Sequence, residues 1–591
     1  MTTLIPTTAM TVETGLVPTP PAGLVPTPPW WQSAVVYQIY PRSFADSNGD
    51  GVGDLPGIVA QLDYLQGLGV DVLWLCPIYR SPQVDNGYDV SDYQDIDPLF
   101  GTLDDFDALV AAAHDRGLRI VMDLVVNHTS SLHPWFIDAR SSAGSAQRDW
   151  YIWRPPRPGR RGGEPGAEPN DWRSFFAGPA WTWDEATGAY YLHLFSAQQP
   201  DLNWDNPLVR EAVHTMMRWW LERGVDGFRM DVINLISKDP ADLQRDGSPL
   251  PDDGPNLHTY LAELRREVFG SHPEACLTVG EMPGATLEQA RLVTAPRRRE
   301  LDMIFQFEHV SLDHRDSKWD AVPLHLPDLK RSLARWQTGL AEQGWNSLYF
   351  ENHDQPRSVS RWGSTRPEFR ARSAKALATV LHLHRGTPYI FQGQELGMTN
   401  TVLTTRTDLR DIEAVRALDE LMASGASEEA ALATIRPMCR DNARTPVQWT
   451  PGPSAGFCPP GTTPWIAVNP NHVIINAAAQ VDDPCSIHSH YRRLIALRHS
   501  SDLVRWGDFQ PLCLDHPTLF AFTRSLNQET WLVLANWSDH PLDLPAAALA
   551  PMTNAAGATI VLATDRPAGP TPPIRTLAPW EAVILALDTR H

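Results

Sequence analysis

Five short segments of the chain each end an apolar run with residues suited to acid–base or nucleophilic chemistry. They carry the runs GYD, DLVVNH, GFRMDVINL, TVGEM and FENHDQ, at 87–89, 123–128, 227–235, 278–282 and 350–355. Apolar runs that end in carboxylates and histidine are typical of the inward strands of a (β/α)8 barrel, whose C-terminal ends form an active site. The pattern therefore predicts a barrel fold and a site rich in carboxylates.

Composition and charge are those expected of a large enzyme that acts on a neutral substrate. The chain has 591 residues, 42% of them hydrophobic, which is enough for a substantial core and more than one domain. With 70 acidic against 49 basic residues the net charge is −21, which argues against nucleic acid as a partner. We expect a small neutral substrate and a monomer or weak homo-oligomer.

The cysteines and the hydropathy pattern bear on the cellular compartment. Six cysteines occur without the paired spacing of a zinc site or a disulfide framework: Cys76, Cys276, Cys439, Cys458, Cys485 and Cys513. The N-terminus lacks the apolar core of a signal peptide, and no stretch approaches the ~20 apolar residues of a membrane span. We therefore expect a cytoplasmic protein without a membrane anchor.

Strand-like and helical runs alternate through most of the chain, as in repeated βα units. Strands are predicted at 35–40, 72–75, 120–126, 227–230, 277–279, 303–307, 347–350 and 388–391, and helices include 103–116 and 207–223. The predicted fold class is α/β, a (β/α)8 TIM barrel formed by 30–127 and 201–505.

Four other regions depart from this alternation. At 128–200 a Gly-, Pro- and Arg-rich loop lies among aromatic residues, so we expect an inserted domain after the third strand. An irregular polar insertion is expected at about 395–465. Residues 506–591 predict a C-terminal antiparallel β domain without helices. Residues 1–29 repeat the run GLVPTPP and predict a flexible Pro-rich tail.

The chain resembles the α-amylase superfamily, specifically the α-glucosidase and oligo-1,6-glucosidase branch of glycoside hydrolase family 13. The resemblance extends from about Trp30 to the C-terminus and rests on the segments VYQIYPRSFADSNGDGVGDLPGI, GFRMDVINLISK, VGEMPG, GWNSLYFENHDQPRSVSRWG and CRDNARTPVQW. It implies a (β/α)8 barrel with a domain B inserted after the third strand and a β-sandwich domain C. This agrees with the organisation predicted above.

The resemblance also implies three catalytic carboxylates: Asp231 as nucleophile, Glu281 as acid/base and Asp354 as a third group that binds sugar hydroxyls. Glycosidic cleavage requires one ionised and one protonated carboxyl. Arg229 lies two residues before Asp231, so strand periodicity puts both side chains on the inward face. A cation there favours the ionised form of Asp231.

Further residues are implied to hold the glucose unit. The resemblance assigns hydroxyl binding to His128 and His353, and stacking and gripping of the non-reducing-end glucose to Tyr88 and Asp89. Arg440 is expected to pair with Asp89 and close the pocket behind that sugar, with Arg444 as a competitor. A closed pocket makes an enzyme exo-acting, because no polymer can extend past the glucose.

A loop near the N-terminus has the composition of a calcium site. Oxygen ligands alternate with glycines that permit a tight turn, at Asp46, Asn48, Asp50, Val52 and Asp54. Gly57 stands where an EF-hand requires Glu, so we predict a different, short Ca²⁺ loop, as the resemblance implies. A metal-free turn rich in Asp and Asn is the alternative. No organic cofactor is expected.

Two residues bear on the linkage that is cleaved. The resemblance associates Val after the nucleophile with α-1,6 links and Thr with α-1,4 links, and here that residue is Val232; Gln199 opens the run QPDLN, also of the α-1,6 type. An apolar side chain offers no hydrogen bond to a sugar in the α-1,4 pose. We expect an exo-acting retaining α-glucosidase that cleaves or transfers glucose from short isomalto-oligosaccharides.

Three alternatives remain open. Trehalose-6-phosphate hydrolases share this Val, although a phosphate calls for Arg or Lys near the leaving group. Sucrose isomerases and transglucosylases differ in how water reaches the glycosyl-enzyme, which the sequence leaves undecided. Non-catalytic heavy chains of amino-acid transporters are a remote alternative from another class, because all three acidic residues are present and no membrane span is found.

Overall fold

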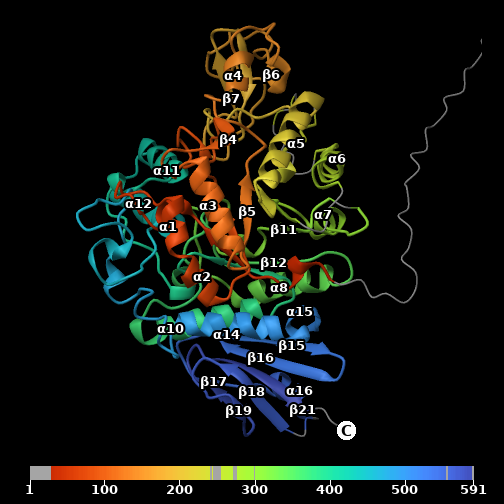
Figure 1. The fold of residues 1–591 in the computed structure, drawn as a ribbon, viewed down its shortest axis with the longest axis vertical. Coiled ribbons are helices and arrows are strands. Elements are labelled where there is room, and N and C mark those ends of the chain that lie inside the picture. The colour runs from red at the N-terminus through yellow and green to blue at the C-terminus, as the bar shows by residue number, and fades with distance from the viewer. Residues whose placement is uncertain are drawn as a thin grey trace, which may run out of the picture.

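The computed structural model describes residues 28–239, 243, 246, 254–270, 276–298, 300–553, 555 and 557–588. Nearly all of the predicted Pro-rich tail lies outside these residues. Figure 1 shows the chain as three stacked parts, with the inserted domain at the top, the barrel in the middle and a sheet at the C-terminal end below.

Eight parallel strands form the barrel, as predicted. They are β1 (Val36–Ile39), β2 (Val72–Leu75), β5 (Arg119–Leu124), β9 (Gly227–Met230), β10 (Leu277–Glu281), β11 (Met303–Phe305), β12 (Ser347–Leu348) and β13 (Thr387–Phe391). Each pairs with the next, and β13 pairs with β1. A parallel bridge between Ile304 and Asn346 joins β11 to β12 and closes the circle.

Helices cover the outside of the barrel, so the strands are buried on both faces and are apolar almost throughout. These helices are α1 (Leu55–Ala60), α2 (Leu62–Leu68), α3 (Leu103–His114), α5 (Pro207–Glu222), α6 (Leu257–Phe269), α7 (Leu287–Val293), α8 (Leu326–Gly339) and α10 (Pro367–His382). Local signals fix their starts. Thr102 and Asp105 form a capping box at α3, and Asn206 caps α5 ahead of Pro207.

The inserted domain contains the helix α4 (Pro134–Ala139) and an antiparallel sheet of β6 (Trp153–Arg154), β7 (Trp181–Asp184) and β8 (Ala189–Leu192). Its many aromatic residues form its core: the rings of Phe136 and Trp153 stack with centroids 5.7 Å apart. A bridge between His128 and Asp201 brings its two ends together over the barrel. The hairpin of β3 (Tyr79–Arg80) and β4 (Asp92–Ile96) lies beside it.

The prediction of an irregular insertion at 395–465 was wrong in part, because two helices form there. They are α11 (Ile412–Ala423) and α12 (Glu428–Ile435), which pack together around the buried Leu418 and Leu432. Both have ordinary helix-start signals, since Asp411 caps α11 and Ser427 caps α12.

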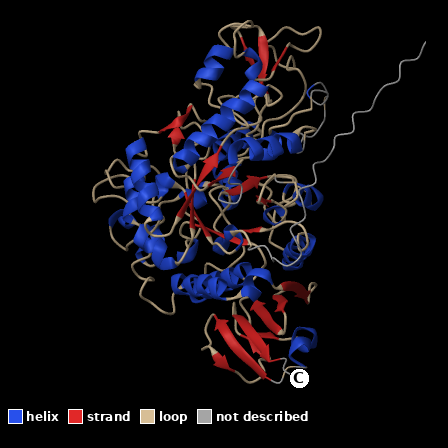
Figure 2. Ribbon diagram, turned by 45° about the vertical axis from the view of Figure 1, so that its right-hand side comes forward, coloured by secondary structure: helices blue, strands red, loops and turns tan. Residues whose placement is uncertain are grey.

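The C-terminal domain is an antiparallel sheet, as predicted (Figure 2). Its order is β14 (Asp508–Leu512), β15 (Leu519–Leu526), β16 (Glu529–Asn536), β21 (Ala582–Asp588), β18 (Gly557–Ala563) and β19 (Gly569–Pro570), with β17 (Leu542–Asp543) and β20 (Thr576–Leu577) as a separate pair. The prediction that it contains no helix was wrong, because α16 (Ala546–Thr553) packs its buried Ala548 among apolar residues of this sheet, including Leu532 and Leu585.

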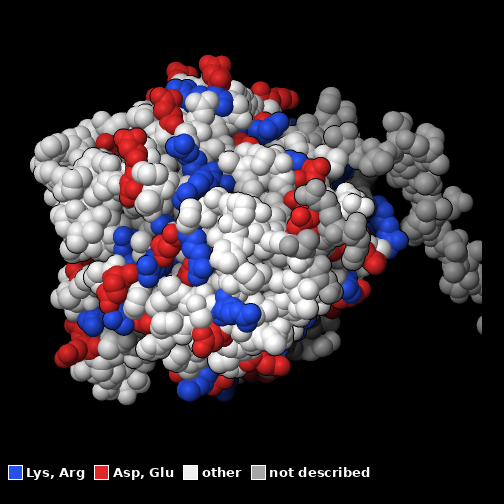
Figure 3. Space-filling model, turned by 90° about the horizontal axis from the view of Figure 1, so that it is seen from below, with Lys and Arg blue, Asp and Glu red and all other residues white. Residues whose placement is uncertain are grey.

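The helices α10 and α14 (Ile487–Ser500) lie between the barrel and this sheet (Figure 1). In the part of the chain that the structure describes, no helix is long and apolar enough to cross a membrane. Seen from the side of the C-terminal domain, acidic and basic side chains are interspersed over the surface (Figure 3).

Candidate active site

A cavity of about 260 Å³ opens at the C-terminal ends of the barrel strands. The three predicted catalytic carboxylates meet there. Asp231 follows β9, Glu281 ends β10, and Asp354 lies in the loop after β12. Of the other predicted site residues, five also line the cavity: Tyr88, His128, Gln199, Val232 and Arg440.

Arg229 links the carboxylates at the base of the site. Its Nη1 donates to Asp123 Oδ1 at 2.8 Å and to Asp231 Oδ1 at 2.7 Å, and its Nη2 lies 2.5 Å from Glu281 Oε1. The guanidinium is 1% exposed. Strand periodicity predicted the contact with Asp231, whereas the contacts with Asp123 and Glu281 cross from β9 to its two neighbours.

The two carboxyls at this guanidinium differ in proton affinity. Burial raises the pKa of Asp231 to about 7 and that of Glu281 to about 8, while Arg229 opposes both shifts. Glu281 is raised further by the neighbouring charge of Asp231. When one proton remains between them, it therefore resides on Glu281, which leaves Asp231 ionised.

Asp354 is held in its ionised form. Burial acts to raise its pKa, but the positive charges of Arg440 and Arg444 outweigh burial and hold the pKa well below its ordinary value. Its Oδ1 accepts from Arg444 Nη2 at 2.7 Å and from Arg440 Nη1 at 3.3 Å. Arg444, which the sequence left as a competitor of Arg440, thus binds the third carboxylate.

The rings of Tyr88 and His353 stack with centroids 5.2 Å apart and an angle of 4° between their planes. Gln38, on β1, lies 2.8 Å from His353 Nδ1, and the Tyr88 hydroxyl lies 2.7 Å from Nε2. Burial lowers the pKa of His353 to about 3, so the imidazole is neutral. Sequence reasoning missed Gln38, although it occupies the first strand of the barrel.

The segment of chain that enters the inserted domain places His128 beside Tyr88 at the cavity. Its Nε2 lies 3.0 Å from the Tyr88 carbonyl oxygen and 3.3 Å from Gln199 Nε2. Burial lowers the pKa of His128 to about 4. The ring is therefore a neutral hydrogen-bonding group at the cavity.

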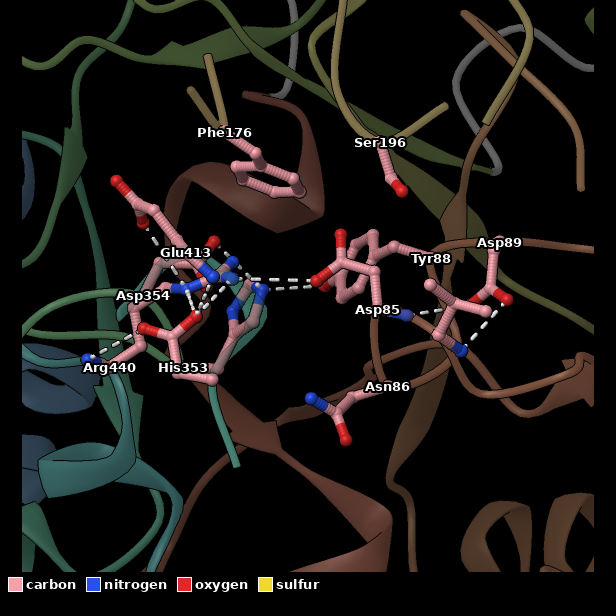
Figure 4. Close-up of polar contacts among 12 residues, drawn as sticks. Asp85, Asn86, Tyr88, Asp89, Phe176, Ser196, His353, Asp354, Glu413 and Arg440 are labelled. Carbon is pink, nitrogen blue, oxygen red and sulfur yellow. Dashed lines mark hydrogen bonds and ion pairs between the residues drawn. The ribbon is translucent and has the colours of Figure 1, made fainter. Parts of the chain in front are cut away.

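The predicted pairing of Arg440 with Asp89 is wrong, and Asp85 takes that position. Asp89 is fully buried, and its carboxylate accepts from Ser81 Oγ at 2.9 Å and from the backbone N–H groups of Val84 and Asp85 at 2.9 and 3.0 Å. It holds the loop 81–89 in shape and points away from the cavity (Figure 4). Both aspartates occur in the run VDNGYD, so composition alone could not separate them.

Arg440 is the centre of a second charge network. Its Nη2 lies 3.4 Å from Asp85 Oδ1 and 2.5 Å from Asp411 Oδ1, and its Nε lies 3.5 Å from Glu413 Oε2 (Figure 4). Its guanidinium carbon lies 5.1 Å from the centre of the Phe176 ring. Asp411 and Glu413 were missed because they lie at the start of α11, where an irregular segment was expected.

Val232 has a backbone conformation that β-branched residues rarely adopt. Its φ of 35° and ψ of 43° are left-handed, and its N–H donates to Glu281 Oε2 at 3.2 Å. Such strain, when held by surrounding packing, is typical of functional sites. The turn places the side chain of Val232 in the cavity wall beside Asp231.

None of the predicted calcium ligands lines the cavity. In the loop 46–54, Asp46 Oδ1 accepts from the N–H groups of Asn48 and Gly49 at 3.1 and 2.6 Å, and Asp54 Oδ1 caps α1 through the N–H of Gly57 at 2.7 Å. Among the described residues, no group of three or more His, Cys, Asp or Glu side chains is arranged to hold a metal ion.

Comparison with known proteins agrees with this geometry. Residues 38–507 match the model of the alpha-amylase catalytic domain family. The chain is 51% identical to an oligo-1,6-glucosidase of Halalkalibacterium halodurans, over 86% of this chain and 90% of that one. It is 48% identical to a trehalose-6-phosphate hydrolase of Bacillus subtilis (strain 168), over 86% and 90%.

Similarity to solved structures agrees with the sequence comparisons. A crystal structure of Bacillus licheniformis trehalose-6-phosphate hydrolase superposes with a TM-score of 0.88 at 42% identity, over 95% of this chain and all of that one. A trehalulose synthase from Pseudomonas mesoacidophila MX-45 gives the same TM-score, identity and coverage. The similar proteins thus include hydrolases and a synthase.

Proposed function

Because this chain belongs to the alpha-amylase family of glycosidases, we propose that it is an exo-acting retaining α-glucosidase with a preference for α-1,6 links. The observation that carries the proposal is the guanidinium of Arg229, which contacts Asp231 and Glu281 at once. Two carboxyls held on one guanidinium lie close together, which supports the short separation of a retaining pair.

In the first step Asp231 attacks the anomeric carbon of the terminal glucose, and Glu281 gives its proton to the departing glycosidic oxygen. The pKa order of the two groups supports these roles, because Glu281 keeps its proton longest. In the second step Glu281, now ionised, removes a proton from water. The resulting hydroxide equivalent releases glucose from Asp231.

The remaining groups position the sugar. Asp354 is ionised and accepts hydroxyl hydrogens, while neutral His128 and His353 donate or accept hydrogen bonds. The stacked ring of Tyr88 supplies an apolar face. Asp85 takes the gripping role that the sequence assigned to Asp89. With Arg440 it closes the cavity behind the glucose, which supports an exo mode of action.

The oligo-1,6-glucosidase relative supports the α-1,6 preference. Val232 and Gln199 both line the cavity, where Val232 adds no hydrogen-bonding group. For trehalose 6-phosphate, the leaving-group side must bind a phosphate dianion. The cavity-lining cations Lys318 and Arg440 are both already paired with carboxylates, Lys318 with Glu413 at 2.5 Å, which favours a neutral leaving group.

The test is a substrate panel under initial-rate conditions with isomaltose, panose, maltose, sucrose and trehalose 6-phosphate. We expect the highest kcat/KM on isomaltose or panose, with glucose as the released product. A higher kcat/KM on trehalose 6-phosphate would contradict the proposal and indicate a trehalose-6-phosphate hydrolase. Isomaltulose or trehalulose formed from sucrose would indicate an isomerase.

We also propose a structural Ca²⁺ at the loop 46–54. Asp46, Asn48 and Asp50 offer hard oxygen ligands at alternate positions, with the Val52 carbonyl and Asp54 completing the set. Among the described residues, Asp46 Oδ2 accepts only the N–H of Gly51, at 2.8 Å, so this oxygen keeps a lone pair for an ion. The ion would connect the loop to the start of α1 and would lie outside the active-site cavity.

Removal of Ca²⁺ should therefore lower the melting temperature but leave the turnover of the folded enzyme unchanged. Scanning calorimetry with EGTA, against EGTA plus excess Ca²⁺, measures the first quantity. A melting temperature independent of Ca²⁺ would reject the site, and Asp50→Ala, which removes an exposed ligand, should reproduce the chelator effect.

The domain boundaries proposed for the chain are 30–127 with 201–505 for the barrel, 128–200 for the inserted domain and 506–591 for the C-terminal domain. We propose a cytoplasmic location, which is supported by six cysteines that are all free in the structure. The proposed oligomeric state is a monomer or weak homo-oligomer.

A further inference from the structure

Three of the motifs described above each contain a polar residue without a part in the proposed reaction. They are Asn127 in DLVVNH, Asp201 in QPDLN and Lys238 in GFRMDVINLISK. The structure brings them together where the inserted domain joins the barrel, because Asn127 follows β5, Asp201 lies where the chain returns from the inserted domain, and Lys238 follows β9. All three are buried. Polar groups buried in this way pair with one another.

Lys238 fixes the orientation of the Asn127 amide. Its Nζ donates to Asn127 Oδ1 at 2.6 Å and lies 2.9 Å from Asp201 Oδ2. An ammonium group only donates hydrogen bonds, so the amide oxygen must face Lys238 and the amide nitrogen must face away. The Nδ2 atom accordingly lies 3.3 Å from Asp201 Oδ2 and 3.2 Å from His128 Nδ1. Asn127 thus presents a hydrogen-bond donor to the His128 ring.

The same order of donors and acceptors fixes the position of the proton on His128. Burial lowers the pKa of the ring to about 4, so near neutral pH it carries a single N–H. Nδ1 faces the amide N–H of Asn127 and must accept, which leaves the proton on Nε2. The Nε2 atom lies 3.0 Å from the carbonyl oxygen of Tyr88, a group that can only accept. Both sides of the ring therefore require the Nε2–H tautomer.

The hydrogen bond from Nε2 holds the turn 85–88, which carries two groups of the proposed glucose grip. Within this turn the Tyr88 N–H donates to Asp85 O at 3.1 Å, and the Tyr88 carbonyl oxygen accepts from His128. A second donor, Gln199 Nε2, lies 3.1 Å from the same carbonyl oxygen and 3.2 Å from Asp85 Oδ2. Loss of the proton from Nε2 would remove one of these two supports.

We propose that Lys238 is a positioning residue for the terminal glucose. It acts through Asn127, which keeps His128 a donor to the turn 85–88. The inference rests on the proposed α-glucosidase function and assigns part of its substrate binding to a residue that lines a separate hollow, of about 230 Å³, at the junction with the inserted domain. The catalytic carboxylates are held by Arg229, so loss of Lys238 should raise KM more than it lowers kcat.

Two variants remove the ammonium group. Lys238→Met leaves the buried Asp201 without its cation, which costs stability, so Lys238→Met/Asp201→Asn removes both charges together. The matched control is Arg140→Met, which takes the cation from Asp184, a buried carboxylate elsewhere in the inserted domain. We expect kcat/KM on isomaltose to fall about tenfold in both Lys238 variants, mainly through KM, and to change less than about twofold in the control.

Nitrogen NMR of ring-labelled histidine measures the tautomer itself, and His128→Asn identifies the His128 signals by difference. We expect the proton on Nε2 in the wild type and in Arg140→Met, and a loss of this preference in the folded double variant. A proton on Nδ1 in the wild type would overturn the inference. An unchanged tautomer or an unchanged kcat/KM in the double variant would also overturn it, as would an equal kinetic loss in Arg140→Met.

These outcomes differ from a failure of the function on which the inference rests. A wild type that does not cleave isomaltose would reject the proposed α-glucosidase function. The tautomer is measured without substrate, so the NMR experiment decides the effect of Lys238 on His128 in either case.

Discussion

At the scale of single residues, the site is organised by two guanidinium groups with different tasks. Arg229 joins the groups that we assign to bond making and breaking, and Arg440 joins those that we assign to the grip on the terminal sugar. Both are buried, so each depends on its carboxylates for compensation of its charge. Replacing one carboxylate therefore disturbs a whole network.

We assign the contact with the terminal glucose to Asp85 rather than to Asp89, and this assignment gives a direct prediction. Asp85→Asn should lower kcat/KM on isomaltose by about 100-fold, because the amide loses the charged contact with Arg440 and with a sugar hydroxyl. The melting temperature should change less than the kinetics, because Arg440 keeps its contacts with Asp354, Asp411 and Glu413. Asp89→Asn should act in the opposite way, lowering the melting temperature through the loop 81–89, since its carboxylate accepts three local hydrogen bonds.

Steady-state kinetics and thermal unfolding of both variants decide this assignment. Equal kinetic losses in the two variants, or a loss confined to Asp89→Asn, would return the gripping role to Asp89.

The pKa values of the catalytic pair predict a narrow pH optimum. Activity should rise as Asp231 loses its proton near pH 7 and fall as Glu281 loses its proton near pH 8. The pH profile of kcat/KM measures both limbs. Glu281→Gln should remove the alkaline limb, because an amide does not titrate; an alkaline limb that survives in this variant would assign it to another group.

At the scale of elements, the turn after β9 determines which side chain lines the cavity beside Asp231. Val232→Thr keeps a β-branched side chain in the same left-handed turn and adds one hydroxyl at the cavity. A hydrogen bond worth about 1 kcal/mol to the leaving sugar of maltose would raise the maltose to isomaltose ratio of kcat/KM roughly fivefold. A ratio that moves less than about twofold in the folded variant would exclude Val232 as the discriminator.

The packing of α10 on α14 contains an acid-sensitive group. His382 is buried, its ring lies 5.5 Å from that of Tyr491, and neither ring nitrogen has a hydrogen-bond partner among the described residues. Burial, with a smaller contribution from the charge of Arg498, lowers its pKa to about 3. The unfolded chain, with a pKa near 6.5, therefore binds a proton first as the pH falls.

Stability from His382 is thus complete above pH 6.5 and is lost as the pH falls toward 3, by about 1 kcal/mol at pH 5.5. His382→Leu should remove that share of the acid dependence. The measurement is the free energy of unfolding in urea at pH 7.5 and 5.5 for both proteins. Groups that do not interact with His382 titrate equally in both proteins, so an unchanged difference between the two pH values would contradict the assignment.

At the scale of the whole molecule, the sequence predicted what depends on local pattern. Apolar runs located the eight barrel strands to within a few residues, because a parallel strand buried on both faces is apolar throughout. The strand ends then located Asp231, Glu281 and Asp354. The resemblance to a family supplied the roles that the pattern alone left open.

What the sequence could not predict depends on contacts between distant segments. Asp85 and Asp89 lie in one short run, and only the folding of the loop around Asp89 distinguishes them. Asp411 and Glu413 reach Arg440 because α11 packs against the barrel mouth, which no local signal reports. The helix α16 was missed because α16 is short, contains Pro551, and is fixed by packing on the C-terminal sheet.

We propose that one buried guanidinium holds a nucleophile and an acid close enough for double displacement with retention. The direct measurement is proton NMR of the glucose anomers during the first minutes of isomaltose hydrolysis, before mutarotation. We expect α-glucose to accumulate first and Asp231→Asn to lose several orders of magnitude in turnover. β-Glucose as the first product would rule out a retaining mechanism.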